Sequence, residues 1–260
     1  MNTKKNNLVF YIALIICALI CIWAVGFNQS FTAASSAMFT FFTTDFGWLY
    51  CAAMLAFVFF AVFIAFSKWG NIRLGEDQEK PEYSTLSWFA MLFGCGMGVG
   101  LVFWGVAEPL SFYLRPAAGI TPSSPDAANF AVKAAYMHWG VSPWANYSVI
   151  GLALAYFGFR KKKKGMISTT LIPLIGEERA EGWLGTLVDI LAVFATVAGI
   201  VTSLGLGVMQ INSGLHMVLG LPSNITVQII IIVLISVIYI WTAASGIEKG
   251  IKAISDVNLY

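Results

Sequence analysis

The amino-acid sequence predicts an all-α integral membrane protein whose chain crosses the lipid bilayer several times. Hydrophobic residues make up 58% of the chain and charged residues only 11%, with a mean hydropathy of +0.79. A single soluble core of this length would not bury so much apolar surface. The apolar residues also form uninterrupted blocks of roughly 20 residues, the length of a membrane-spanning helix, whereas β-barrel strands give short alternating segments.

Six apolar blocks are expected to be membrane spans. The first follows Lys4 and Lys5, exceeds the apolar core of a typical signal peptide and has no small-residue cleavage site, so it is expected to be a retained helix. The third, fourth and fifth are long enough to predict tilt or interruption. In order, the blocks are Leu8–Phe27, Gly47–Phe66, Leu86–Tyr113, Ala127–Phe159, Leu184–Leu215 and Ile225–Ser245.

The basic residues predict which side of the membrane each loop faces. With a cytoplasmic N-terminus, all of the 15 lysines and arginines except Arg115 and Lys133 fall on the cytoplasmic side. The positive-inside rule therefore favours this orientation in the cell membrane. The dense run Arg160–Lys164 is interpreted as an inside anchor in preference to a lipid-headgroup or regulatory site. A formal net charge of +2 is too small to predict nucleic-acid binding.

Four glycines alternate in the middle of the third block, within the string FGCGMGVGLVF: Gly94, Gly96, Gly98 and Gly100. Each costs about 1 kcal/mol in a helix interior relative to alanine. Two interpretations stay open. Gly96 and Gly100 form a GxxxG pair that allows close helix packing, or the helix is locally unwound and its carbonyls bind a cation or its missing side chains make room for a substrate.

Aromatic residues gather in the fourth block, in the string HWGVSPWANY, at a depth where interfacial tryptophans are not expected. Pro143 is predicted to break the local hydrogen-bond ladder, and helical spacing brings Trp139, Trp144 and Tyr147 near one another. Such aromatics form either a cage that attracts a quaternary ammonium by cation–π interaction or ordinary packing of a helix bundle.

Hydroxyl groups follow in the fifth block, on Thr196, Thr202 and Ser203. They either coordinate a hard cation or hydrogen-bond to the preceding helical turn, which is the commoner arrangement.

An enzyme is not expected, because no catalytic constellation is found. The sequence has no GxSxG, no HExxH and no paired carboxylates on one helix face, and His138 and His216 lie in different blocks. The four cysteines form no CxxC pair and are interpreted as small core residues. No cofactor is predicted, and the spans hold too few polar residues to line a channel.

Long stretches of the chain closely resemble the betaine/carnitine/choline transporter family, and the match runs in order over essentially the whole sequence. The stretches are GMGVGLVFWGVAEPLSFY (Gly96–Tyr113), HWGVSPWANY (His138–Tyr147), LIPLIGEERAEGWLGTLVDILAVFATVAG (Leu171–Gly199) and TSLGLGVMQI (Thr202–Ile211).

The resemblance implies a LeuT-like inverted-repeat transporter fold. Members have two peripheral helices and then two inverted repeats of five helices, and they commonly form trimers. On that template, residues 1–85 hold the N-terminal tail, two peripheral helices and a cytoplasmic loop. Residues 86–260 form an incomplete first repeat of about four helices and the start of the next. The chain is therefore expected to continue in the native protein beyond the amphipathic stretch Glu248–Tyr260.

The resemblance also implies a substrate site. In the family, the glycine-rich stretch is unwound beside the substrate, and an aromatic cage holds the trimethylammonium group. Carried over by motif, the substrate-binding residues are Trp139, Tyr147, Trp144, Met97 and Gly98.

Ion binding is implied by the same match. The backbone carbonyls of Gly94 and Met97 correspond to sodium ligands of the family, and Thr196 corresponds to the first threonine of a second sodium site. Ile200 stands where the second threonine would be, which puts the second ion in doubt. The GMGVG form is typical of ion-coupled symporters, with either sodium or protons as the coupling ion.

The expected function is ion-coupled import of a quaternary-ammonium compatible solute such as glycine betaine, choline or carnitine. A rival of another class stays open: a truncated, non-transporting fragment, or a membrane component that acts only after assembly. The rival is considered because, in the family, further sodium ligands and cage tryptophans lie in the second repeat.

Overall fold

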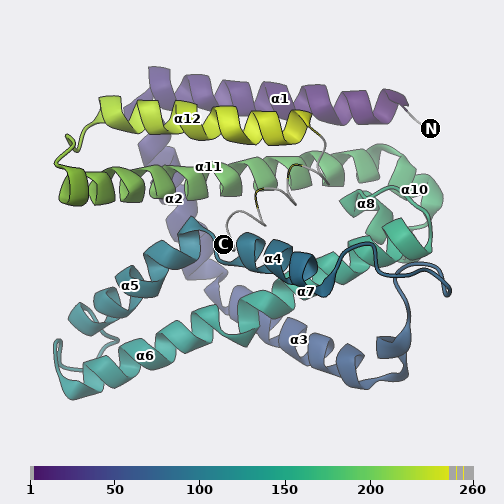
Figure 1. The fold of residues 1–260 in the computed structure, drawn as a ribbon, viewed down its shortest axis with the longest axis horizontal. Helices are drawn as coiled ribbons and strands as arrows, with labels where there is room; N and C mark the ends of the chain where they lie inside the picture. Colours follow the sequence, from purple (N-terminus) through teal and green to yellow (C-terminus); the bar gives the residue numbers. More distant parts are fainter. Residues whose placement is uncertain (1–2, 246–249, 251–253, 255–260) are drawn as a thin grey trace. The chain divides into compact units, whose positions relative to one another are not determined.

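The computed structural model describes residues 3–245 together with residues 250 and 254, and every regular element in this part of the chain is helical (Figure 1). The further stretch expected from Glu248 onward lies almost wholly outside the described residues. The elements are α1 Thr3–Gly26, α2 Asn28–Asp45, α3 Gly47–Phe66, η1 Lys68–Asn71, α4 Thr85–Gly96, α5 Val99–Leu114, α6 Pro125–Trp139, α7 Val141–Ala155, the π-helical turn η2 Tyr156–Arg160, α8 Ile167–Thr170, α9 Ile172–Ile175, α10 Glu177–Glu181, α11 Trp183–Leu219 and α12 Ile225–Ala244.

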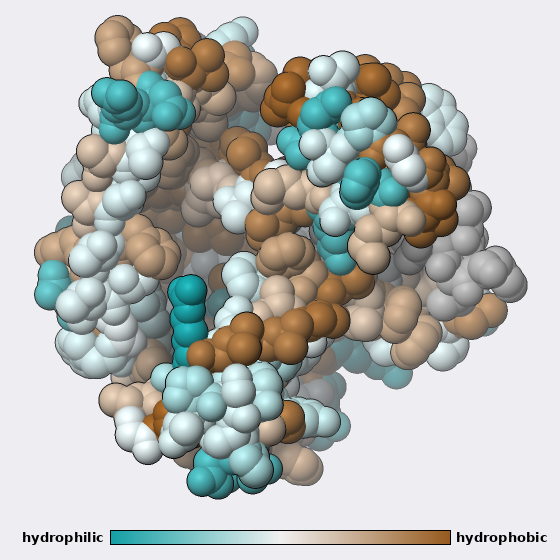
Figure 2. All heavy atoms as spheres, turned by 90° about the vertical axis from the view of Figure 1, so that its left-hand side faces the viewer, coloured by the Kyte–Doolittle hydropathy of each residue, from teal (hydrophilic) through white to brown (hydrophobic). Residues whose placement is uncertain are grey.

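Four of these helices are long and apolar enough to cross a membrane: α1, α3, α11 and α12. They confirm the first, second, fifth and sixth expected spans as helices. Most of their large apolar side chains are exposed in the isolated chain, and Figure 2 shows apolar side chains on the molecular surface. Such a surface needs lipid or other protein against it. The 37 residues of α11 extend about 55 Å, so this helix is longer than the hydrocarbon core is thick.

The third and fourth expected spans are each divided into two shorter helices. The third becomes α4 and α5, which are separated by Met97 and Gly98. The fourth becomes α6 and α7, which are separated by Gly140, and then ends in η2. Tilt or interruption was predicted for the third, fourth and fifth blocks: glycines mark the interruptions in the third and fourth, whereas the fifth is the continuous helix α11.

Helix α2 was not foreseen in the sequence. It follows α1 after the single residue Phe27, and α3 follows it after the single residue Phe46. Its 18 residues include serines and threonines between the aromatics, so they form no apolar block. Length and hydropathy together identify spans but miss a helix of mixed composition.

The chain divides into two compact units. The first contains Met1–Glu79 and Tyr136–Val197, and the second contains Lys80–Ala135 and Ala198–Tyr260. Within the first unit, α3 packs against α7, which Figure 1 shows crossing it, and α8, α9 and α10 contact one another. The boundary between 85 and 86 expected from the family template is not tested by this division.

A buried polar network joins α1 to α8, α10 and α11 in the first unit. The Lys5 ammonium is 3.0 Å from the Asp189 carboxylate and donates to the Ser168 hydroxyl and the Ala180 carbonyl. Asp189 also accepts from the backbone N–H and the hydroxyl of Ser168 at 2.9 and 2.7 Å. A Cβ added to Gly185 would collide with the Ala180 carbonyl oxygen, so glycine permits this close approach. Each charge in the network is therefore both paired and hydrogen-bonded.

The basic run Arg160–Lys164 also makes specific contacts. The Arg160 guanidinium donates to the Asp77 carboxylate at 2.7 Å, and this hydrogen bond holds the pKa of that carboxyl below its usual value of 3.8. Lys162 pairs with Glu76 at 3.1 Å, and Lys163 pairs with Glu177. All three pairs are solvent-exposed, so salt screens them. Besides supplying positive charge, the run therefore tethers the loop that follows α3.

We predict that replacing Lys5 by methionine lowers the free energy of unfolding by about 3 to 5 kcal/mol, because it leaves the Asp189 carboxylate buried without a cation. The measurement is an SDS titration in mixed micelles, followed by circular dichroism. The matched control is Lys162→Met, which removes an exposed ion pair and should change the unfolding free energy little. Equal losses in the two variants would contradict a structural role for the buried network.

Candidate functional site

The break between α4 and α5 lies in the glycine-rich segment of the second unit. Helix α4 ends at Gly96, Met97 leaves the helical region with φ −92° and ψ 44°, and Gly98 precedes α5 in an extended conformation. The Met97 N–H donates to the Phe93 carbonyl at 2.8 Å. The unwinding that the family resemblance implied is therefore present at Met97 and Gly98.

The break frees two backbone carbonyls. In a continuous helix, the N–H of residue 98 would donate to the Gly94 carbonyl and that of Leu101 to the Met97 carbonyl. Here the Leu101 N–H donates instead to the Gly98 carbonyl at 3.1 Å. Among the described residues, no backbone N–H donates to the carbonyl of Gly94 or Met97. These are the two carbonyls that the resemblance assigned to sodium, and that role stays a prediction.

The glycines of this segment are not explained by crowding. A Cβ added at Gly98 or at Gly100 would meet no heavy atom within 4 Å among the described groups. Neither residue has a positive φ. Close helix packing through the GxxxG pair is therefore not seen at Gly100. This result favours the other interpretation of the segment, a locally unwound helix.

The second break, at Gly140 in the first unit, is sterically specified. The Gly140 N–H donates to the Tyr136 carbonyl at 2.9 Å, and an added Cβ would collide with that carbonyl oxygen. Pro143 is the third residue of α7, where its missing N–H would have no helical partner anyway. The expectation that Pro143 causes the break is therefore wrong, because the interruption lies three residues earlier.

The three predicted cage residues flank this break. Trp139 ends α6 and is half-buried, whereas Trp144 and Tyr147 lie on the first turns of α7 and are exposed. The rings of Trp144 and Tyr147 are in contact, with centroids 6.3 Å apart and planes inclined by 42°. The structure thus pairs two of the three aromatics on one helix and places the third just before the glycine. Their role toward a substrate is not tested.

Thr196 lies in the middle of α11, where its hydroxyl donates to the Ala192 carbonyl at 2.8 Å. Thr202 makes the same contact with Ala198 at 2.9 Å. Each hydroxyl oxygen keeps lone pairs that can still accept or coordinate. One turn after Thr196, Ile200 is 60% exposed and offers no oxygen ligand.

One feature of the site and one feature of the supporting fold were missed in the sequence. A break at Gly140 was not predicted, because proline is the stronger sequence signal for a helix break and Pro143 lies nearby. The pairing of Lys5 with Asp189 joins residues far apart in the chain, and a single sequence carries no signal for it. Among the described residues, no cluster of three His, Cys, Asp or Glu side chains is placed to hold a metal ion.

We predict that replacing Gly140 by alanine lowers the free energy of unfolding by about 1 to 3 kcal/mol, because the new methyl group must displace the Tyr136 carbonyl. The control is Gly151→Ala in the interior of α7, where an added Cβ meets no heavy atom within 4 Å. That variant should be as stable as the unchanged chain or gain up to about 1 kcal/mol.

Both variants are compared by thermal unfolding and SDS titration in the same detergent. If Gly140→Ala were as stable as Gly151→Ala, the break would not depend on the missing side chain.

Known proteins resemble this chain over nearly its whole length. A family model described as the betaine/carnitine/choline family transporter matches residues 8–260. A glycine betaine transporter of Bacillus subtilis is 43% identical over 256 residues, which cover 98% of this chain and 50% of the relative. An ectoine/hydroxyectoine transporter of Virgibacillus pantothenticus is 43% identical over 99% of this chain and 51% of its own length. An osmo-dependent choline transporter of Acinetobacter baylyi is 38% identical over 99% of this chain and 37% of its own length. The chain thus spans about half the length of the first two relatives.

Proposed function

The chain belongs to the betaine/carnitine/choline transporter family, and from this premise we propose that it contributes to ion-coupled import of a quaternary-ammonium solute. Glycine betaine is the first candidate, with choline and carnitine as alternatives. The all-α membrane fold agrees with the LeuT-like architecture of the family. It is a transporter chain and not an enzyme.

The observation that carries the proposal is the break at Met97 and Gly98. Unwound segments inside membrane helices are tolerated where they line a cavity or meet a ligand, because their backbone groups otherwise lack partners. The carbonyls of Gly94 and Met97 are left without backbone donors there. Carbonyl oxygens are suitable ligands for a hard cation, so we assign these two to the coupling ion, with sodium preferred to protons.

The aromatic residues support the solute class. A quaternary ammonium has no N–H to donate, and the faces of Trp and Tyr rings attract it through their quadrupoles. The contacting rings of Trp144 and Tyr147, with Trp139 beyond Gly140, provide such faces. The relatives are named for glycine betaine, choline and ectoines, and the ring faces support the quaternary-ammonium solutes among these.

We further propose that the N-terminus is cytoplasmic, as the distribution of lysine and arginine favours, and that the carrier assembles as a homotrimer, as the family resemblance implies. The Thr196 hydroxyl binds a second ion only where another group supplies a further oxygen ligand, because Ile200 supplies none.

Transport is tested by uptake of radiolabelled glycine betaine into cells that lack betaine carriers and express this chain. We expect saturable uptake that needs a sodium gradient and survives collapse of the proton gradient. Uptake that follows the proton gradient alone would overturn the sodium assignment. If the protein is in the membrane and no uptake occurs, these 260 residues do not suffice for transport.

Solute contact is tested separately by equilibrium binding of labelled glycine betaine to the purified chain. Replacing Trp139 by leucine should weaken binding about tenfold or more, because it removes one cation–π face. The matched control is Trp48→Leu at the start of α3, an exposed tryptophan outside the proposed cage. Unchanged binding in Trp139→Leu, or equal losses in both variants, would contradict the cage.

A further inference from the structure

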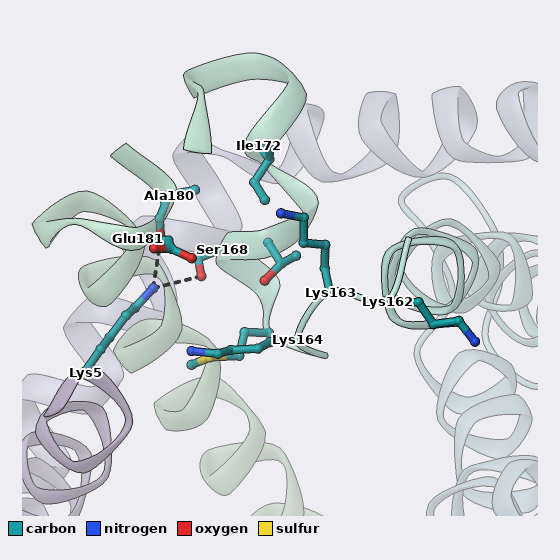
Figure 3. A pocket seen from close by; sticks show the side chains of 10 residues that line it. Lys5, Lys162, Lys163, Lys164, Ser168, Ile172, Ala180 and Glu181 are labelled. Atoms are coloured by element: carbon teal, nitrogen blue, oxygen red, sulfur yellow. Dashed lines mark hydrogen bonds between the residues drawn. The ribbon is translucent and has the colours of Figure 1, made fainter. Parts of the chain in front are cut away.

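A pocket of about 220 Å³ lies in the first unit, and none of its lining residues belongs to the glycine-rich segment or to the aromatic string. The N-terminal part of α1, the basic run and the short helices α8, α9 and α10 contribute its walls (Figure 3). Its wall includes apolar side chains, Met166 and Ile172, as well as several charges. Neither the proposed ion ligands nor the aromatic cage lines it.

Three of the four lysines that line the pocket are already neutralised. The Lys5 ammonium is 3.0 Å from the Asp189 carboxylate. Lys163 pairs with Glu177, and the Lys162 ammonium is 3.1 Å from Glu76. Figure 3 shows the Lys162 amine pointing away from the other labelled side chains. These three cations therefore add little net charge to the pocket.

Three lining groups make no hydrogen bond or ion pair through their side chains among the described residues. Lys164 and Glu181 are exposed, and neither takes part in an ion pair within 4 Å, although Glu181 lies close enough to Lys163 to interact with it electrostatically. Figure 3 shows them on opposite sides of the hydrogen bond from Lys5 to Ser168. Thr169 is only 8% exposed and lines the pocket, and its hydroxyl makes no hydrogen bond to any described group. Its hydroxyl oxygen is not among the fully buried side-chain atoms that lack a partner, so it is open to the pocket and available to a ligand or to water.

The chemistry of these groups specifies a zwitterion. One ammonium and one hydroxyl donor suit a phosphate, and one carboxylate suits an ammonium. A purely anionic group would place a second negative charge beside Glu181, and Lys163, a cation that interacts with Glu181, is already paired with Glu177. Because the chain lies in a bilayer and the wall is partly apolar, the nearest source of such a group is a lipid headgroup.

We propose that this pocket binds the phosphoethanolamine headgroup of a membrane lipid, with Lys164 and Thr169 on the phosphate and Glu181 on the ammonium. The lipid would then bridge the basic run, α8 and α10, which the neighbouring Lys5 network already holds against α1 and α11. Soluble phosphoethanolamine and inorganic phosphate share part of this chemistry and are the competing occupants.

The test is native mass spectrometry of the full 260-residue chain, purified in detergent and titrated with three lipids of identical acyl chains. We expect phosphatidylethanolamine to bind more tightly than phosphatidylglycerol or phosphatidylcholine. Lys164→Gln should weaken binding of phosphatidylethanolamine and phosphatidylglycerol about tenfold. Glu181→Gln should weaken phosphatidylethanolamine and leave phosphatidylglycerol unchanged or stronger.

Matched variants separate a specific site from diffuse attraction. Lys161 belongs to the same run, but its amine lies 5.6 Å from the Tyr156 ring centroid, and it does not line the pocket. Lys161→Gln should therefore leave lipid binding unchanged. Thr169→Val should weaken phosphatidylethanolamine, and Thr169→Ser, which keeps the hydroxyl, should restore it. Circular dichroism and the thermal midpoint of each variant report whether it is folded.

Four results would overturn the proposal. Lys161→Gln weakens binding as much as Lys164→Gln, or the three lipids bind equally. Thr169→Ser fails to restore binding although it folds as the unchanged chain does. Finally, soluble phosphoethanolamine or inorganic phosphate binds with the same variant pattern while the lipids do not, in which case the occupant is the free compound.

Discussion

Backbone N–H and C=O groups inside a bilayer have no water to bond, so each must find its partner within the protein. This constraint makes every regular element in the described part of the chain a helix, including the four that are long and apolar enough to span. It also makes each interruption informative, because an interrupted helix leaves polar groups that something else must satisfy. The chain has two such interruptions in its expected spans, at Met97–Gly98 and at Gly140.

The two interruptions differ in what glycine does. At Gly140, the Tyr136 carbonyl leaves no room for a side chain, so glycine is required simply to form the break. At Gly98, a side chain would meet no described atom, and the conformation does not require glycine. The helix stability that is lost by having glycine at position 98 is therefore not offset by closer packing. The freed carbonyls of Gly94 and Met97 are the observation on which the proposed ion binding rests.

The sequence predicts the long helices well because the length of an apolar block decides whether a segment spans. It fails for α2, whose serines and threonines interrupt the apolar pattern although the segment is helical. The glycine cluster correctly predicted the position of the first break. The second break was expected at Pro143 but lies at Gly140. The ion pair of Lys5 with Asp189 depends on tertiary structure alone. The carbonyls and aromatics were assigned through family motifs, because residue patterns alone left packing as an equally good explanation.

Satisfaction of polar groups separates structural from functional residues in this chain. Lys5, Asp189 and Ser168 are buried, yet every charge among them is paired and hydrogen-bonded, so the network stabilises the fold and leaves no free group for a ligand. Among the described residues, no backbone N–H donates to the carbonyls of Gly94 and Met97, and the hydroxyl of Thr169, which is open to the pocket, makes no hydrogen bond. Unsatisfied polar groups in low dielectric are costly, and they persist where a ligand completes them. By this criterion, the buried ion pair that looks most like an active centre is a structural element, and the less conspicuous backbone break is the place where we propose ion binding.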